Sequence, residues 1–171
     1  LDYFGTDGDT LASVVGQLLR EAGETVSVAE SCTGGSLGAM ITSVPGSSDY
    51  FLGGVIAYDN QAKISLLGVS PKDLAQFGAV SEAAAKQMAA GIQKQLGTSW
   101  GLSITGIAGP GGGTESKLVG LVYIGLTAPD GQVDSFEYRL GKQRERETIR
   151  YISACNALDR LRRKLVTGKV A

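Results

Sequence analysis

Short β-prone segments alternate with helical segments along most of this 171-residue chain, and this alternation restricts the fold more than any other feature. Strands are expected at residues 25–29, 51–58, 100–105, 119–127 and 133–140, and helices at 9–22, 36–43, 60–67, 71–77, 81–96 and 144–166. The last two strands flank a hairpin signal, Ala128-Pro129-Asp130-Gly131, so they should pair antiparallel. Strands that alternate with helices favour a sheet covered on both faces. The pattern predicts an α/β fold, a three-layer α/β/α sandwich with a mixed β-sheet.

The length and composition indicate one ordinary globular domain. Residues 1–8 are polar and unpatterned and are expected to form a loose N-terminus, while residues 9–171 form the single domain. A net charge of -1 offers no basic excess for nucleic acid, and no segment is apolar enough to span a membrane. The two cysteines, Cys32 and Cys155, form no closely spaced pair. We therefore expect a cytoplasmic protein without a disulfide framework or zinc site.

The sequence contains no histidine, and this limits its chemistry sharply. Ser-His-Asp triads, Cys-His pairs, histidine-based zinc sites and a histidine general base are all excluded. Any acid–base catalysis must use Lys, Asp, Glu, Tyr or Cys.

A first candidate site is the turn Ala29-Glu30-Ser31-Cys32-Thr33-Gly34-Gly35, where a strand meets a helix. Ser31 can be a nucleophile there, and the first amides of the helix can hold an oxyanion or a phosphate. The alternative is that Ser31 or Thr33 only caps the helix. Cys32 is a rival nucleophile, although the chain has no histidine to form an ion pair with it.

A serine hydroxyl needs a base, and in this chain a desolvated lysine is the natural one because burial lowers its pKa. Lys63 lies just after a predicted strand, and Tyr58 precedes it with a phenol that can relay a proton or orient the amine. Taken alone, a lysine in this place is more often an exposed surface group.

A glycine-rich segment follows the strand at residues 100–105 and can cradle an anion with its backbone amides. Its glycines are Gly106, Gly109, Gly111, Gly112 and Gly113. It matches neither a Walker A loop nor a strict dinucleotide-binding motif, and a flexible surface loop is the alternative.

Three arginines, Arg144, Arg146 and Arg150, cluster at the start of the last predicted helix, where cations oppose the helix dipole. Contact with a ligand phosphate would explain their position. Salt bridges with Glu145 and Glu147 on a solvated face are the other interpretation.

Several motifs in fixed order resemble the CinA C-terminal domain family, the nicotinamide-nucleotide amidases. They are A-E-S-C-T-G-G, V-P-G-S-S-x-Y-F-L-G-G-V-I-A-Y-D-N-Q-A-K, G-A-V-S-E and T-G-I-A-G-P-G-G-G-T, and the resemblance covers residues 11–166. The resemblance implies hydrolysis of nicotinamide mononucleotide to nicotinic acid mononucleotide and ammonia, with no metal and no cofactor. It also implies a small-molecule nucleotide as partner and a homodimer or larger homo-oligomer. The chain looks like the stand-alone form, without the additional N-terminal domain of some relatives.

By the same resemblance Ser31 corresponds to the nucleophile, Lys63 to its base and Tyr58 to their neighbour. The residues expected to bind substrate are Glu30, Cys32, Thr33, Gly34, Gly35, Thr105, Gly106, Gly109, Gly111, Gly112, Gly113 and Arg146. Three departures from the family pattern concern loop shape and arginine placement: T-E-S-K-L-V-G, the residues Asp59 and Gln61, and a lengthened segment at residues 141–146. Two other functions stay open, namely a non-catalytic nucleotide-binding module linked to competence or DNA damage, and a Ser-Lys amidase for another carboxamide.

Overall fold

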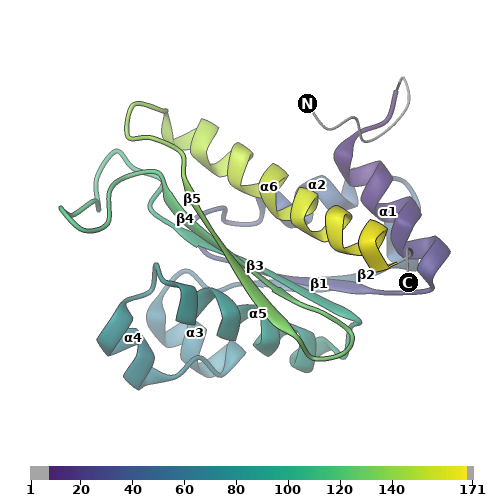
Figure 1. Ribbon diagram of the computed structural model, residues 1–171, viewed down its shortest axis with the longest axis horizontal. Coiled ribbons are helices and arrows are strands. Elements are labelled where there is room, and N and C mark those ends of the chain that lie inside the picture. The colour runs from purple at the N-terminus through teal and green to yellow at the C-terminus, as the bar shows by residue number, and fades with distance from the viewer. Residues whose placement is uncertain (1–7, 169–171) are drawn as a thin grey trace.

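A computed structural model describes residues 8–168 and shows a five-stranded sheet between two layers of helices (Figure 1). The strands are β1 (Val26–Glu30), β2 (Phe51–Ile56), β3 (Trp100–Gly106), β4 (Leu121–Thr127) and β5 (Val133–Arg139). The helices are α1 (Leu11–Ala22), α2 (Ser36–Thr42), α3 (Asn60–Leu67), α4 (Pro71–Phe77), α5 (Glu82–Leu96) and α6 (Arg146–Thr167). A short 3₁₀ helix, η1 (Ser47–Asp49), occupies a predicted loop. The predicted loose N-terminus lies outside the described residues except for Gly8.

The strand order is β2-β1-β3-β4-β5, and it makes the sheet mixed. Strand β1 runs parallel to both β2 and β3, whereas β4 is antiparallel to β3 and to β5. The predicted α/β/α sandwich with a mixed sheet is therefore confirmed, as is the antiparallel pairing of the last two strands.

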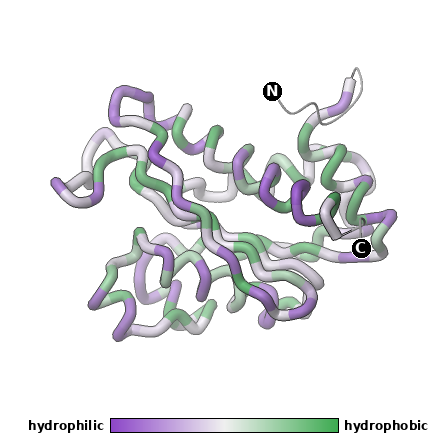
Figure 2. Tube along the Cα trace, in the orientation of Figure 1, coloured by the Kyte–Doolittle hydropathy of each residue, from purple (hydrophilic) through white to green (hydrophobic). Residues whose placement is uncertain are grey.

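Each face of the sheet carries its own apolar core. Helices α1, α2 and α6 cover one face, where Val15, Leu19 and Leu158 are almost fully buried. Helices α3, α4 and α5 cover the other, with Met88 and Ile92 at its centre. Hydrophobic residues recur along the central strands and alternate with hydrophilic ones along α6 (Figure 2). This alternation is typical of a helix that covers a sheet with one face only.

The helix ends follow the sequence signals. The Ser81 hydroxyl accepts a hydrogen bond from the Ala84 amide and so caps α5. Gly97 ends the same helix in the left-handed conformation, with φ at 63°. None of the helices between residues 8 and 168 has both the length and the apolar character needed to cross a bilayer.

The topology brings three loops to one edge of the sheet. Because β1, β2 and β3 are parallel, their carboxyl ends lie at the same edge. The chain leaves β1 through α2 on one face and leaves β2 through α3, α4 and α5 on the other. A crevice forms where connections diverge to opposite faces of a sheet, and ligands bind there in many α/β proteins.

Candidate active site

Ser31 and Lys63 meet at this edge, although 32 positions separate them in the sequence. Ser31 follows β1 directly, and its amide donates to the Ile104 carbonyl of the neighbouring strand β3. Lys63 lies in the first turn of α3, and its Nζ atom is 3.1 Å from Ser31 Oγ. The Lys63 side chain is only 1% exposed, so the interpretation as a surface group is excluded.

Two backbone carbonyls fix the direction of the lysine amine. Lys63 Nζ donates to the Ala57 carbonyl at 2.8 Å and to the Tyr58 carbonyl at 3.1 Å. Burial lowers the pKa of Lys63 below its ordinary value, although Asp59 and Cys32 oppose this shift electrostatically. When the amine is neutral, two N–H bonds can point at the carbonyls, which leaves its lone pair directed at Ser31. This is the geometry of a general base beside a nucleophile.

Glu30 holds the turn after Ser31 from the inside of the protein. Its carboxylate is 2% exposed and accepts hydrogen bonds from the amides of Gly35 at 3.2 Å, Leu37 at 3.0 Å and Gly38 at 3.0 Å. The first amides of α2 are thus occupied, which corrects the expectation that they hold an oxyanion or phosphate. Earlier in the turn, neither Cys32 nor Thr33 donates its amide to a backbone carbonyl of the described chain.

Arg146 joins the loop after β2 to the glycine-rich segment. It begins α6, and it donates to the Gly109 carbonyl at 2.7 Å and to the Tyr58 hydroxyl at 3.1 Å. The Tyr58 side chain is 62% exposed, and its phenol contacts Arg146, whereas its carbonyl orients Lys63. Because a guanidinium carries five N–H groups, Arg146 keeps donors for a ligand.

The other two arginines of the cluster have different tasks. Arg144 Nε donates to the Leu140 carbonyl in an exposed loop. Arg150 donates to the Thr33 carbonyl at 2.9 Å and to the Ser36 hydroxyl at 3.3 Å, so it braces the turn after the nucleophile. Of the three, only Arg146 lines the cavity described next.

These groups surround a cavity of about 270 Å³. Ten residues singled out in the sequence line it: Ser31, Cys32, Tyr58, Lys63, Thr105, Gly106, Gly109, Gly111, Gly112 and Arg146. Five others do not, namely Glu30, Thr33, Gly34, Gly35 and Gly113, and the first four build the turn behind Ser31. The lining also includes Ala79, Val80, Ile107 and Ala108, which carry no polar side chain and gave no chemical signal in the sequence.

Two positions of the glycine-rich segment must be glycine, because neighbouring atoms leave no room for a Cβ atom. A Cβ atom at Gly106 would lie 2.8 Å from Val122 Cγ2 and 3.2 Å from Cys32 Sγ. One at Gly109 would lie 2.5 Å from Val119 Cγ1, and Gly109 also has a φ of 79°. Glycine at these two positions therefore lets the backbone of the segment, which lines the cavity, pack closely against Val119 and Val122.

Cys32 lines the cavity but lacks the properties of a nucleophile. The residue is 7% exposed, and burial raises the pKa of its thiol to about 11. A thiol with this pKa stays protonated at neutral pH, and the thiolate is the reactive form. The geometry thus favours Ser31 over Cys32. Among residues 8–168, no three Cys, Asp or Glu side chains are grouped as ligands for one metal ion.

Comparisons of the sequence with a family model and with curated proteins identify the same family. Residues 8–165 match the model of the CinA C-terminal domain. A CinA-like protein of Gloeothece citriformis is 68% identical over 165 residues, which are 96% of this chain and 40% of that protein. A CinA-like protein of Synechocystis is 66% identical over 165 residues, again 96% of this chain and 40% of that protein. The chain thus spans about 40% of the length of these curated relatives.

Solved structures agree with this result. The competence/damage inducible protein CihA from Agrobacterium tumefaciens has a TM-score of 0.87 and 39% identity, covering 94% of this chain and 97% of that one. A CinA superfamily protein from Klebsiella pneumoniae has a TM-score of 0.87 and 30% identity, covering 92% of this chain and 96% of that one. The chain therefore belongs to the CinA C-terminal domain family.

Proposed function

We propose that this chain is an amidase that hydrolyses nicotinamide mononucleotide to nicotinic acid mononucleotide and ammonia. The observation that carries the proposal is the contact between Lys63 Nζ and Ser31 Oγ in a cavity at the carboxyl edge of the sheet. In a chain without histidine, this buried pair supplies both a nucleophile and a base. The substrate comes from the family resemblance, and a carboxamide suits the chemistry of the pair.

The reaction proceeds in two halves. Neutral Lys63 takes the Ser31 proton as Oγ attacks the carboxamide carbon, and a tetrahedral oxyanion forms. The resulting Lys63 ammonium returns the proton to the amide nitrogen, the C–N bond breaks and ammonia leaves. Water then attacks the acyl-serine ester with Lys63 again as base, which releases the carboxylic acid and restores Ser31.

The oxyanion requires donors beside Ser31. The amides of Cys32 and Thr33 are the candidates, because those of Gly35, Leu37 and Gly38 are held by Glu30. The Glu30 carboxylate points toward α2, and Glu30 does not line the cavity.

The 5′-phosphate is assigned to the glycine-rich segment and Arg146. Arg146 is the one cation of the arginine cluster that lines the cavity, and Gly109, Gly111 and Gly112 line it too. A phosphate held there would orient the carboxamide toward Ser31 from the remote end of the substrate.

The test is a substrate panel with chelator-treated protein, in which ammonia and the carboxylic acid product are both measured. Nicotinamide mononucleotide should give the two products in equal amounts and should react faster than nicotinamide riboside or unrelated carboxamides. Binding of the nucleotide without release of ammonia would contradict the proposal and favour the non-catalytic module. Faster hydrolysis of another carboxamide would replace the substrate but keep the Ser-Lys chemistry.

A further inference from the structure

Residues 77–80, which comprise the last residue of α4 and the start of the linker to α5, contribute to the cavity wall, and we call them the 77–80 wall. Ala79 and Val80 line the cavity. All four carbonyls of this wall accept hydrogen bonds from side chains. Ser81 Oγ donates to the Gly78 carbonyl at 2.9 Å, and Thr105 Oγ1 donates to the Ala79 carbonyl at 2.7 Å.

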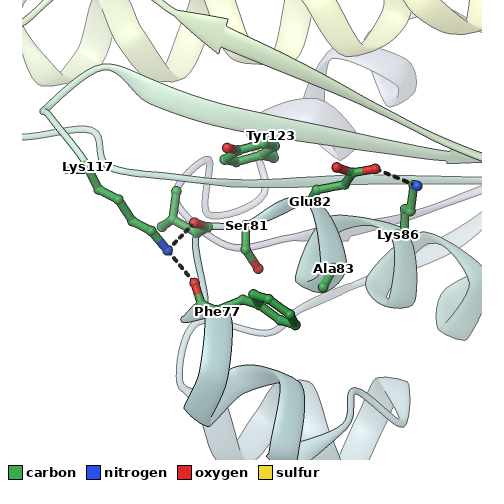
Figure 3. Close-up of a pocket in the computed structure, with 8 residues that line it drawn as sticks. Phe77, Ser81, Glu82, Ala83, Lys86, Lys117 and Tyr123 are labelled. Carbon is green, nitrogen blue, oxygen red and sulfur yellow. Dashed lines mark hydrogen bonds and ion pairs between the residues drawn. The ribbon is translucent and has the colours of Figure 1, made fainter.

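Lys117 supplies the other two hydrogen bonds. Its Nζ donates to the Val80 carbonyl at 2.8 Å. It also donates to the Phe77 carbonyl, as Figure 3 shows. Gly78 leaves room for the ammonium group, because a Cβ atom there would lie 3.0 Å from Lys117 Nζ. One cation thus spans both ends of the wall.

Lys117 itself belongs to the end of the glycine-rich segment. Its amide donates to Thr114 Oγ1 at 3.0 Å, and its carbonyl accepts from the Thr114 amide at 2.8 Å. Residues 110–116, which precede Lys117, are all exposed. On the other side of this exposed stretch, Arg146 holds the Gly109 carbonyl. The segment is therefore fixed by one cation before its exposed part and by another after it.

Among the described residues, no side chain near Lys117 pairs with its ammonium group. A hollow of about 520 Å³ adjoins the wall on the side of Phe77, Lys86 and Tyr123 (Figure 3). Other polar side chains that line this hollow already have partners: Lys86 contacts Glu82 at 2.5 Å, and the Tyr123 hydroxyl donates to Glu137 at 2.8 Å. The ammonium of Lys117 is turned to the wall carbonyls.

We propose that Lys117 is a positioning residue that latches the glycine-rich segment to the 77–80 wall and so fixes the cavity in its binding shape. The inference rests on the proposed amidase function for its kinetic test only. Without the latch, wall and segment must be ordered when the substrate binds, which costs conformational entropy at that moment. Loss of the latch should weaken substrate binding more than it slows the chemical steps at Ser31.

The test compares Lys117→Met with Lys117→Arg and with Lys72→Met, a control at an exposed lysine of α4. Lys117→Met should raise KM for nicotinamide mononucleotide about tenfold, equivalent to about 1.4 kcal/mol, and keep kcat within about threefold. Lys117→Arg should restore most of the affinity because it retains donors and charge. Lys72→Met should behave like the parent.

Hydrogen exchange of the protein without substrate gives a second readout, independent of the reaction. In Lys117→Met, amides of residues 78–82 and 111–116 should exchange faster than in the parent and in Lys72→Met. If the parent does not act on the nucleotide, the proposed function fails, and the exchange result alone decides on the latch. Unchanged KM and unchanged exchange would overturn the inference, as would a fall in kcat at constant KM.

Discussion

The Glu30 carboxylate lies 3.0 Å from the Gly38 amide, within the protein and directly behind the nucleophile turn. Glu30→Gln keeps the size of the side chain but removes the charge and places an NH₂ group against backbone N–H donors. A buried donor without an acceptor costs about 1–3 kcal/mol, so the free energy of unfolding should fall by that amount. Urea unfolding measures it.

Glu82→Gln is the matched control for Glu30→Gln, because Glu82 is the first residue of helix α5 but has an exposed side chain, whereas the Glu30 carboxylate is buried against the first amides of α2. It should change the free energy of unfolding by less than about 1 kcal/mol. Equal effects of the two substitutions would contradict the assignment of Glu30 to the inner side of the turn.

Arg146→Gln should weaken recognition of the phosphate. Loss of charge-assisted hydrogen bonds corresponds to about 10- to 150-fold in affinity. We expect KM for nicotinamide mononucleotide to rise within this range while the much slower reaction of nicotinamide riboside changes little. Arg144→Gln, at the exposed neighbour, should leave both substrates unaffected. An equal loss for the two substrates in Arg146→Gln would place the phosphate elsewhere.

Cys32→Ala should retain activity within about threefold, because the thiol is buried and its pKa of about 11 keeps it protonated. Treatment of the parent with iodoacetamide at pH 7 should likewise inactivate it only slowly. Steady-state kinetics of the variant and the time course of alkylation check the two statements. A loss of activity as deep as that of Ser31→Ala would instead make Cys32 the nucleophile.

The rate should rise with pH on the acid side of its profile. Lys63 acts as base only when neutral, and burial lowers its pKa below the ordinary 10.5. The profile of kcat/KM should therefore show one ionisation whose midpoint lies below 10.5, with loss of activity as pH falls through it. A midpoint at or above 10.5 would contradict a desolvated lysine base.

The same pKa shift affects stability with a definite sign. Above pH 10.5 the lysine is neutral in both the folded and the unfolded state, so its ionisation does not change the free energy of unfolding. As pH falls from 10.5 to the lower pKa of the folded state, the unfolded chain binds the proton first and folding is destabilised. Lys63→Met should remove this part of the pH dependence, which unfolding at several pH values would reveal.

The sequence predicted the layers of the fold because helix caps and hydrophobic periodicity are local. The helix expected at residues 81–96, for example, corresponds to α5 (Glu82–Leu96), which begins after Ser81 and ends before Gly97. The order of the strands is not local, and the contact between Ser31 and Lys63 depends on β1 lying beside β2. The residue types alone suggested that Ser31 and Lys63 could act as a nucleophile and its base. That the two side chains are in contact could only be seen once the strand order was known.

Two features of the site were not predicted, for different reasons. Glu30 follows Val26 and Val28 at alternate positions of β1, and this period of two could have placed it on the inner face beside α2. The role of Lys117 had no such signal, because its acceptors are backbone carbonyls 37 and 40 positions away. Every residue type has a backbone carbonyl, so the sequence does not indicate which residues accept these hydrogen bonds.

The measurement that tests the central claim most directly is the rate of ammonia release from nicotinamide mononucleotide by the parent, Ser31→Ala and Lys63→Met. Ser31→Ala should be inactive, and Lys63→Met should lose about 10²- to 10⁴-fold in kcat, because it removes the base but keeps a side chain of similar length. Both variants should still bind the nucleotide. Activity of Ser31→Ala near that of the parent, or Lys63→Met within about threefold of it, would contradict the Ser31–Lys63 pair as the catalytic centre.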